Sequence, residues 1–251
     1  VVIKRSWITA AIDAHIKLDI PMAGGKRGGF DVADSGNDLC SQIHVHGIVA
    51  FWGENWKAEE DELLLSSQRV YNKAIELGSN VHYDSIGVGA GVGANFKQMN
   101  PERKATGLTG VVKYNKFIAG GKVANPDLAY IQTDDEKVTN KDFFSNIKSQ
   151  SWWSVADRFR NTYNAVTKGH EFEAEDLISI SSDMPNLADL VTQLSTPRRD
   201  FAKDGRVKVE SKEDLAKREV DSPNDADAFI MAFSPIEVDA YSDMINMMVG
   251  N

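Results

Sequence analysis

The order in which strand-like and helix-like patterns follow one another most restricts the fold of this chain. Residues 30–56 are rich in Ile, Val and aromatic residues separated by turn residues, which predicts two or three consecutive strands. A helix with one apolar face is expected at residues 59–78, followed by a strand at residues 80–84. A second long helix at residues 144–168, a hairpin at residues 198–210 and two short helices complete the series. This order predicts an α/β fold with a mixed sheet.

Three segments fit this scheme less well. Residues 6–19 space their apolar side chains at helical intervals, and the following Pro21 and GGKRGG sequence predicts that this helix leads into a flexible joint. Residues 97–140 have weak periodicity, so we expect a long excursion over the surface. The pattern of residues 236–251 indicates no role.

Composition limits the classes of function. The chain has 251 residues, 42% of them apolar, and no apolar run approaches the roughly 20 residues that span a bilayer. Its single cysteine, Cys40, excludes internal disulfides and multi-cysteine zinc sites. The 28 basic and 37 acidic residues give a net charge of −9, which argues against a protein that coats nucleic acid by bulk electrostatics. Contact with nucleic acid is therefore expected to be local or metal-assisted.

Glycine-rich segments do not predict a nucleotide site. Gly89, Gly91 and Ala94 fit the G-x-G-x-x-A pattern after a strand, but Pro101 leaves little room for a long helix, and no acid follows at the ribose-binding distance. The GGKRGG sequence lacks the spacing and the Ser or Thr of a Walker A loop. The chain is not expected to hydrolyse ATP by itself.

Histidines and tryptophans offer two further candidates. His44 and His46 lie two residues apart on an expected strand, so they share a face on which a metal could join them, with His82 as a third ligand. We favour the alternative that they are polar members of a half-exposed strand. Trp152 and Trp153 could stack on bases, but in an amphipathic helix at least one is expected in the core.

Three aspartates give the sharpest signal. Asp31 lies within an apolar strand, Asp84 ends another, and Asp225 or Asp227 opens an apolar helix. Burying a carboxylate in such places costs free energy unless a hydrogen-bond donor or a cation compensates its charge. Carboxylates that lie close together repel each other, and a divalent cation removes this repulsion. An all-oxygen set selects Mg²⁺ or Mn²⁺. The alternative is that the acids only start a turn, accept backbone hydrogen bonds or cap a helix.

The two acids of the last helix cannot easily both be ligands. Residues two apart on a helix point about 200° away from each other. We expect Asp227 to face the site, and Asp225 to cap the helix or to support the ligands from behind.

Several motifs together resemble one protein family, the C-terminal nuclease domain of the terminase large subunit of tailed bacteriophages, closest to short-tailed phages that package by the headful method. The resemblance runs from about residue 26 to 235, and the segments that carry it are FDVADSGND, VHYDSIGVGAGVGANF, FFSNIKSQSWWSVADRFR, LSTPRRDFAKDGRVKVESKEDLAKR and SPNDADAFIMAF. It implies an RNase H-like fold of the retroviral integrase superfamily, with a mixed sheet flanked by helices. It also implies metal-dependent hydrolysis of concatemeric double-stranded DNA during genome packaging.

The resemblance assigns roles to individual residues. Asp31 would bridge two Mg²⁺ or Mn²⁺ ions, and Asp84 and Asp227 would complete the catalytic set. Asp225 and Asp34 would support these ligands. Small basic clusters are candidates for contacts with DNA phosphates, although solvated surface is the default for each: Lys26, Arg27, Arg198, Arg199, Lys208 and Lys212.

The resemblance also implies a context for the chain. Residues 1–25 would be a linker helix and joint from an ATPase domain that precedes the nuclease, residues 26–235 the nuclease domain and residues 236–251 a tail. The partners would be double-stranded DNA, the small terminase subunit and the portal ring, with no membrane, in the cytoplasm of the infected bacterial host. A docking module that binds DNA or the portal with little cleavage is the alternative, and a sugar-kinase-like ATPase is a distant third.

Overall fold

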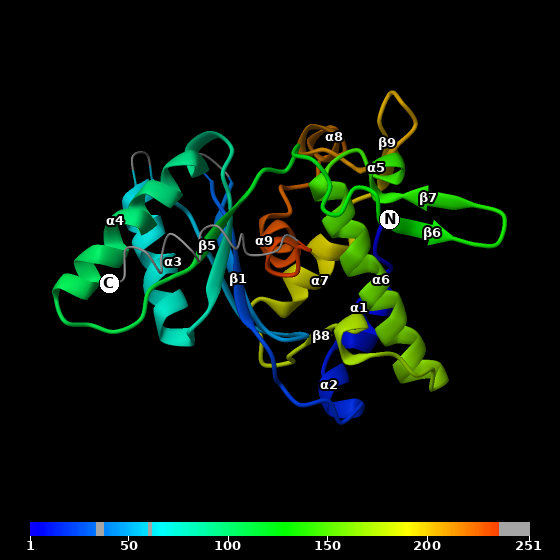
Figure 1. Cartoon of the computed structure of the whole chain (residues 1–251), viewed down its shortest axis with the longest axis horizontal. Helices are drawn as coiled ribbons and strands as arrows, with labels where there is room; N and C mark the ends of the chain where they lie inside the picture. The colour runs from blue at the N-terminus through cyan, green and yellow to red at the C-terminus, as the bar shows by residue number, and fades with distance from the viewer. Residues whose placement is uncertain (34–37, 60–61, 236–251) are drawn as a thin grey trace.

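A six-stranded mixed sheet forms the centre of the protein (Figure 1). The computed structural model describes residues 1–33, 38–59 and 62–235. The strand order is β5-β4-β1-β2-β3-β8, in which β1, β2 and β3 are antiparallel neighbours and the pairs β1–β4, β4–β5 and β3–β8 are parallel. The strands are β1 (Lys26–Asp31), β2 (Cys40–His46), β3 (Val49–Trp56), β4 (Asn80–Asp84), β5 (Tyr114–Phe117) and β8 (Ser179–Ile180).

Helices cover both faces of this sheet. On one face lie α3 (Leu63–Leu77) and α4 (Val92–Ala105), and on the other α9 (Asn224–Ala232) packs directly against β1 and β2. Behind α9 lie α6 (Ile147–Lys168), α1 (Arg5–Ala11) and α7 (Leu187–Ser195). The remaining elements are α2 (Ala14–Lys17), η1 (Gly87–Gly91), β6 (Ala129–Gln132), β7 (Lys137–Thr139), α5 (Asn140–Phe143), η2 (Ala174–Asp176), β9 (Arg199–Phe201), β10 (Val207–Val209) and α8 (Lys212–Lys217).

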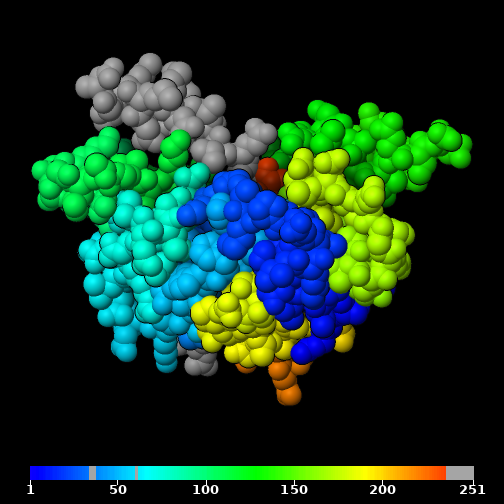
Figure 2. Space-filling model, turned by 90° about the horizontal axis from the view of Figure 1, so that it is seen from below, coloured from blue at the N-terminus to red at the C-terminus, as the bar shows by residue number. Residues whose placement is uncertain are grey.

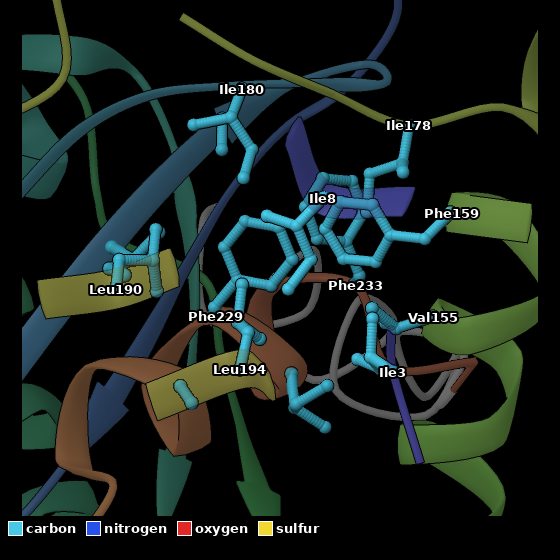
Figure 3. Close-up of a cluster of buried hydrophobic side chains, with 14 of the residues drawn as sticks. Ile3, Ile8, Val155, Phe159, Ile178, Ile180, Leu190, Leu194, Phe229 and Phe233 are labelled. Atoms are coloured by element: carbon cyan, nitrogen blue, oxygen red, sulfur yellow. The ribbon is translucent and has the colours of Figure 1, made fainter. Parts of the chain in front are cut away.

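The α9 face holds the larger apolar core (Figure 3). Phe159 of α6 stacks on Phe229 of α9 with ring centroids 5.9 Å apart. The single helix expected at residues 6–19 is instead two short helices, because Asp13 has a left-handed backbone with φ of 54°. Ile3 and Ile8 are fully buried in this core. The N-terminal segment therefore packs as part of the same body.

The flexible joint expected at GGKRGG is wrong in its last four residues, because these belong to β1. Gly29 lies in the middle of this strand, directly below α9. A Cβ at this position would collide with the carbonyl oxygen of Ala228, so only glycine lets the helix approach so closely. Two of the four glycines that suggested flexibility, Gly28 and Gly29, instead permit close packing.

The surface excursion expected at residues 97–140 is also wrong in part. Helix α4 continues to Ala105 with Pro101 inside it, and β5 joins the central sheet beside β4. The helix that Pro101 was expected to prevent therefore exists, although its second half is mostly exposed. Strands β6 and β7 pair as a separate hairpin that projects from the body (Figure 1).

The other predicted elements are confirmed, some with shifted ends. Helix α3 ends at Gly78 and α6 at Gly169, both with the left-handed backbone of a C-terminal glycine cap. Strands β9 and β10 form the expected hairpin around Gly205. Strand β8 and helix α7 were not predicted. None of the described helices combines the length and apolar character that crossing a membrane requires.

Candidate metal centre

Asp31 and Asp84 lie next to each other at the carboxyl ends of two parallel strands. The register pairs Gly29 with His82 and Phe30 with Tyr83, so the following step of the register brings Asp31 beside Asp84. Phe30 and Tyr83 point into the core under α3 and α4, and the aspartates therefore point to the opposite face, towards α9. Strand register thus gathers two of the three predicted acids.

Asp227 reaches the same place from α9. It lines one small pocket together with Asp31, Asp84 and Lys148. The Asp31 and Asp227 side chains are only 4% and 9% exposed. The structure thus brings together all three predicted ligands, from β1, β4 and α9.

Two lysines lie among these carboxylates. Lys148 Nζ is 2.8 Å from Asp227 Oδ2. Lys212 Nζ is 3.5 Å from Asp31 Oδ2 and 4.0 Å from Asp227 Oδ2. The two ammonium groups compensate carboxylates that would otherwise repel each other in a poorly solvated pocket.

Burial makes the charge of Asp31 costly. Burial, together with the negative charges of Asp227 and Asp84, raises the pKa of Asp31 to about 7 against the opposing effect of the two lysines. Burial also raises the pKa of Asp84, although the backbone N–H of Ile86 donates a hydrogen bond of 3.0 Å to its carboxylate. Such a carboxylate pair is stabilised by a nearby cation of higher charge.

The donor set fits a hard divalent cation in chemistry. Asp31, Asp84 and Asp227 offer only carboxylate oxygens, the ligands that Mg²⁺ and Mn²⁺ prefer. In the described ranges, no group of three or more His, Cys, Asp or Glu side chains is already arranged to hold a metal. Lys148 and Lys212 contact carboxylate oxygens that a cation would take.

Of the two roles expected for Asp225, the helix cap is wrong, and support of the ligands from behind stays a prediction. Its carboxylate is buried and accepts hydrogen bonds from Ser41 Oγ at 2.6 Å and from Asn55 Nδ2 at 3.0 Å. The first backbone N–H groups of α9 are instead satisfied by Gln193 of α7, whose Oε1 accepts those of Asp225 at 2.8 Å and Ala226 at 3.2 Å. Asp225 therefore anchors α9 to β2 and β3. The other supporting candidate, Asp34, lies outside the described residues.

The histidines do not form a metal site. His44 is buried on the α3 face, with Nδ1 2.7 Å from Ser79 Oγ, and burial lowers its pKa to about 3. His82 points to the α9 face, where Nδ1 lies 3.0 Å from the Met231 carbonyl oxygen. The preferred alternative of a half-exposed strand is wrong for these two, because His44 and His82 are both buried. Trp152 is a core residue, as expected for at least one of the tryptophans.

The predicted basic clusters have different surroundings. Lys212 lies within the aspartate pocket, whereas Lys208 pairs with Asp200 at 2.9 Å on the β9–β10 hairpin. Lys26, Arg198 and Arg199 are exposed, and Arg27 is half-buried. Lys148 was missed. A signal did exist, because Lys148 and Lys212 both occupy the first turn of a helix, where the dipole disfavours positive charge.

Comparisons with known proteins support this geometry. No protein-family model matches the chain. No curated protein matches it either. Among solved structures, the nuclease domain of the large terminase subunit gp2 of bacterial virus Sf6 is 26% identical, with a TM-score of 0.81 over 94% of this chain and 99% of that one. The chain matches a terminase nuclease domain.

Two further structures of the Sf6 gp2 terminase domain agree. A mutant form with calcium is 25% identical with a TM-score of 0.78, and a mutant form with manganese and beta-thujaplicinol is 24% identical with a TM-score of 0.82. Each covers 94% of this chain and 99% of the other. The predicted resemblance to terminase nuclease domains and the RNase H-like fold class are confirmed.

Proposed function

We propose that this protein is a metal-dependent endonuclease that cleaves concatemeric double-stranded viral DNA during genome packaging. The observation that carries the proposal is the meeting of Asp31, Asp84 and Asp227 in one pocket of a chain that matches a terminase nuclease domain along nearly its whole length. The solved structures of that domain with manganese and calcium support a divalent cation as its cofactor.

We propose that the three aspartates hold two Mg²⁺ or Mn²⁺ ions, with Asp31 between them. When bound, such ions activate a water molecule and stabilise the leaving oxygen of a phosphodiester. Asp31 is suited to the shared position because it is the most buried of the three and lies beside both others. Lys148 and Lys212, released from the carboxylates, would then face the phosphate.

A second pocket is a candidate position for part of the DNA backbone. It has a volume of about 370 Å³ and lies by the end of β5 and the start of α6, lined in part by Lys116, Lys122 and Asn125. Phe117 lines the aspartate pocket, and its neighbours Lys116 and Ile118 line the larger one. The lysine and asparagine side chains that line the larger pocket are suited to contacts with the sugar-phosphate backbone.

The larger context of the chain is part of the same proposal. We propose an ATPase domain, the small terminase subunit and the portal ring as partners, and the cytoplasm of the infected bacterial host as the site of action. Residues 1–25 would then lead from the ATPase domain, although Ile3 and Ile8 are buried against the nuclease core.

Cleavage of a supercoiled plasmid tests the function. We expect nicking and linearisation with Mn²⁺ or Mg²⁺, and none in excess EDTA. Asp31→Asn keeps the shape of the side chain and should abolish cleavage, whereas Asp183→Asn, at an exposed acid far from the pocket, serves as the matched control. Cutting that persists in EDTA would contradict the proposal. Binding of DNA without any cutting under all metals would favour the docking module.

A further inference from the structure

Two arginines meet over one aromatic ring at the end of α9 that is remote from the aspartates. The guanidinium carbon of Arg27, from β1, is 6.0 Å from the centroid of the Phe233 ring, and that of Arg158, from α6, is 5.8 Å from it. Arg27 and Asp31 are four residues apart on one strand, so roughly 13 Å of β1 separates them. The arginine pair is therefore distinct from the metal centre.

Neither arginine has a carboxylate to neutralise it. In the described parts of the chain, no acidic side chain forms an ion pair with Arg27 or Arg158, and neither guanidinium donates a hydrogen bond. Burial, and then the charge of Arg27, lowers the pKa of Arg158 to about 10, against smaller opposing effects of Asp176 and Glu175. Burial also lowers the pKa of Arg27.

This arrangement is costly for the protein alone. Two like charges share a partly desolvated place, and cation–π contact with one phenyl ring returns only about 1 kcal/mol each. An anion between the guanidinium groups would remove both the repulsion and the unmet hydrogen bonding. The pair is thus suited to a ligand with several oxygen acceptors.

The end of α9 reaches the surface of the molecule. Figure 2 shows the red end of the described chain between the blue N-terminal part and the green segments. Arg27 and Arg158 both retain partial exposure. A ligand can therefore approach without unfolding of the core.

We propose that Arg27, Arg158 and Phe233 form a binding site for a DNA backbone phosphate other than the one that is cut. This inference rests on the proposed function. A planar guanidinium fork matches two phosphate oxygens, and two forks can share one phosphate. At roughly 13 Å from the aspartates, the pair would meet a phosphate on the order of four nucleotides from the cut. A chain of net charge −9 needs such local positive sites to hold a polyanion.

Anion binding tests the site without any cleavage. We would compare melting temperatures of metal-free protein in sodium sulfate and in sodium chloride of equal ionic strength. Sulfate stabilises proteins in general, so the matched control is Arg160→Gln, on the same helix at an exposed arginine that pairs with Asp157. We expect sulfate to raise the melting temperature of the parent and of Arg160→Gln more than that of Arg158→Gln. Arg27→Gln provides a second variant should Arg158→Gln fail to fold.

DNA binding identifies the source of the anion. We would measure binding of a fluorescent 30-base-pair duplex in EDTA over a range of salt concentrations. Loss of one phosphate contact should reduce the slope of log K against log salt by about 0.9 in Arg158→Gln but not in Arg160→Gln. A sulfate effect without a change in slope would overturn the DNA assignment and indicate a carboxylate or a free phosphate. No difference in sulfate between Arg158→Gln and Arg160→Gln would overturn the site itself. Both measurements remain informative if the protein never cuts DNA.

Discussion

The carbonyl oxygen of Ala228 in α9 lies directly over Gly29 in β1, where no side chain separates helix from strand. This contact sets the height of α9 above the sheet. Asp227 is the residue before Ala228, and Asp31 is two residues after Gly29. The distance between the two carboxylates therefore depends on a glycine that takes no part in the chemistry.

Replacement of Gly29 should affect both stability and metal binding. In Gly29→Ala the new methyl group must push α9 away, which we expect to cost about 1–3 kcal/mol of unfolding free energy. The larger separation of the aspartates should also weaken Mn²⁺ binding, measured by calorimetry. Gly25→Ala is the control, because a Cβ there meets nothing within 4 Å. Equal effects of the two substitutions would contradict this account.

Asp225 and Asp227 should respond to truncation in opposite ways. Asp225→Ala leaves Ser41 and Asn55 without their buried acceptor, so we expect a loss of about 3 kcal/mol in urea unfolding, with cleavage retained while the protein is folded. Asp227→Ala removes a partner of partly exposed lysines and should change stability by less than about 1 kcal/mol while abolishing cleavage. A loss of only about 1 kcal/mol for Asp225→Ala would instead fit a capping role.

Divalent cations should stabilise the folded protein. At 100 times its dissociation constant, Mn²⁺ should add about 2.7 kcal/mol, which for a chain of this size raises the melting temperature by on the order of 5–10 °C. Asp31→Asn should lose most of this shift, and Asp183→Asn should keep it. A shift that Asp31→Asn leaves intact would mean that the cation binds elsewhere.

Acid should destabilise the protein through its buried histidines. Burial lowers the pKa of His44 to about 3 and that of His82 to about 4, so below the usual pKa near 6.5 only the unfolded chain takes up these protons. The free energy of unfolding should then fall by about 1.4 kcal/mol per pH unit for each group as pH decreases from 6.5 towards 4. Asp31, with its raised pKa, acts in the opposite direction in this range.

Comparison of variants isolates the histidine contribution. We would measure the free energy of unfolding of His44→Gln in urea from pH 7 to 4. It should depend on pH less steeply than that of the parent, because one proton fewer is taken up on unfolding. His170→Gln, at an exposed histidine, should leave the slope unchanged. Identical slopes for the parent and His44→Gln would show that His44 titrates normally.

Local pattern was sufficient to predict the elements that position the three acids. Asp31 and Asp84 each end an apolar strand, and Asp227 lies at the start of an apolar helix. The sequence alone therefore indicates that these carboxylates are buried and need a partner to compensate their charge. Gly78 and Gly169 likewise mark helix ends because their left-handed backbone is a local requirement. These features depend on neighbours a few residues away.

Features that depend on distant partners could not be predicted. Asp225 anchors α9 through hydrogen bonds from Ser41 and Asn55, which belong to β2 and β3. Gly29 is required because α9 packs directly on it. Strand β5 has little periodicity because it is short and both its faces meet apolar clusters, with Tyr114 packed against one and Phe117 against another. Tertiary packing, rather than propensity, decides such segments.

The distribution of the acids along the chain has a consequence for synthesis. Strands β1 and β4 emerge early from the ribosome, whereas α9 follows only after nearly all other described elements. A nascent chain released as far as α8 holds Asp31 and Asp84 but lacks Asp227 and the helix that covers β1. Contacts of such long sequence separation form late in folding. If Asp227 is a metal ligand, as we propose, translation products that stop before α9 would not cut the DNA around them.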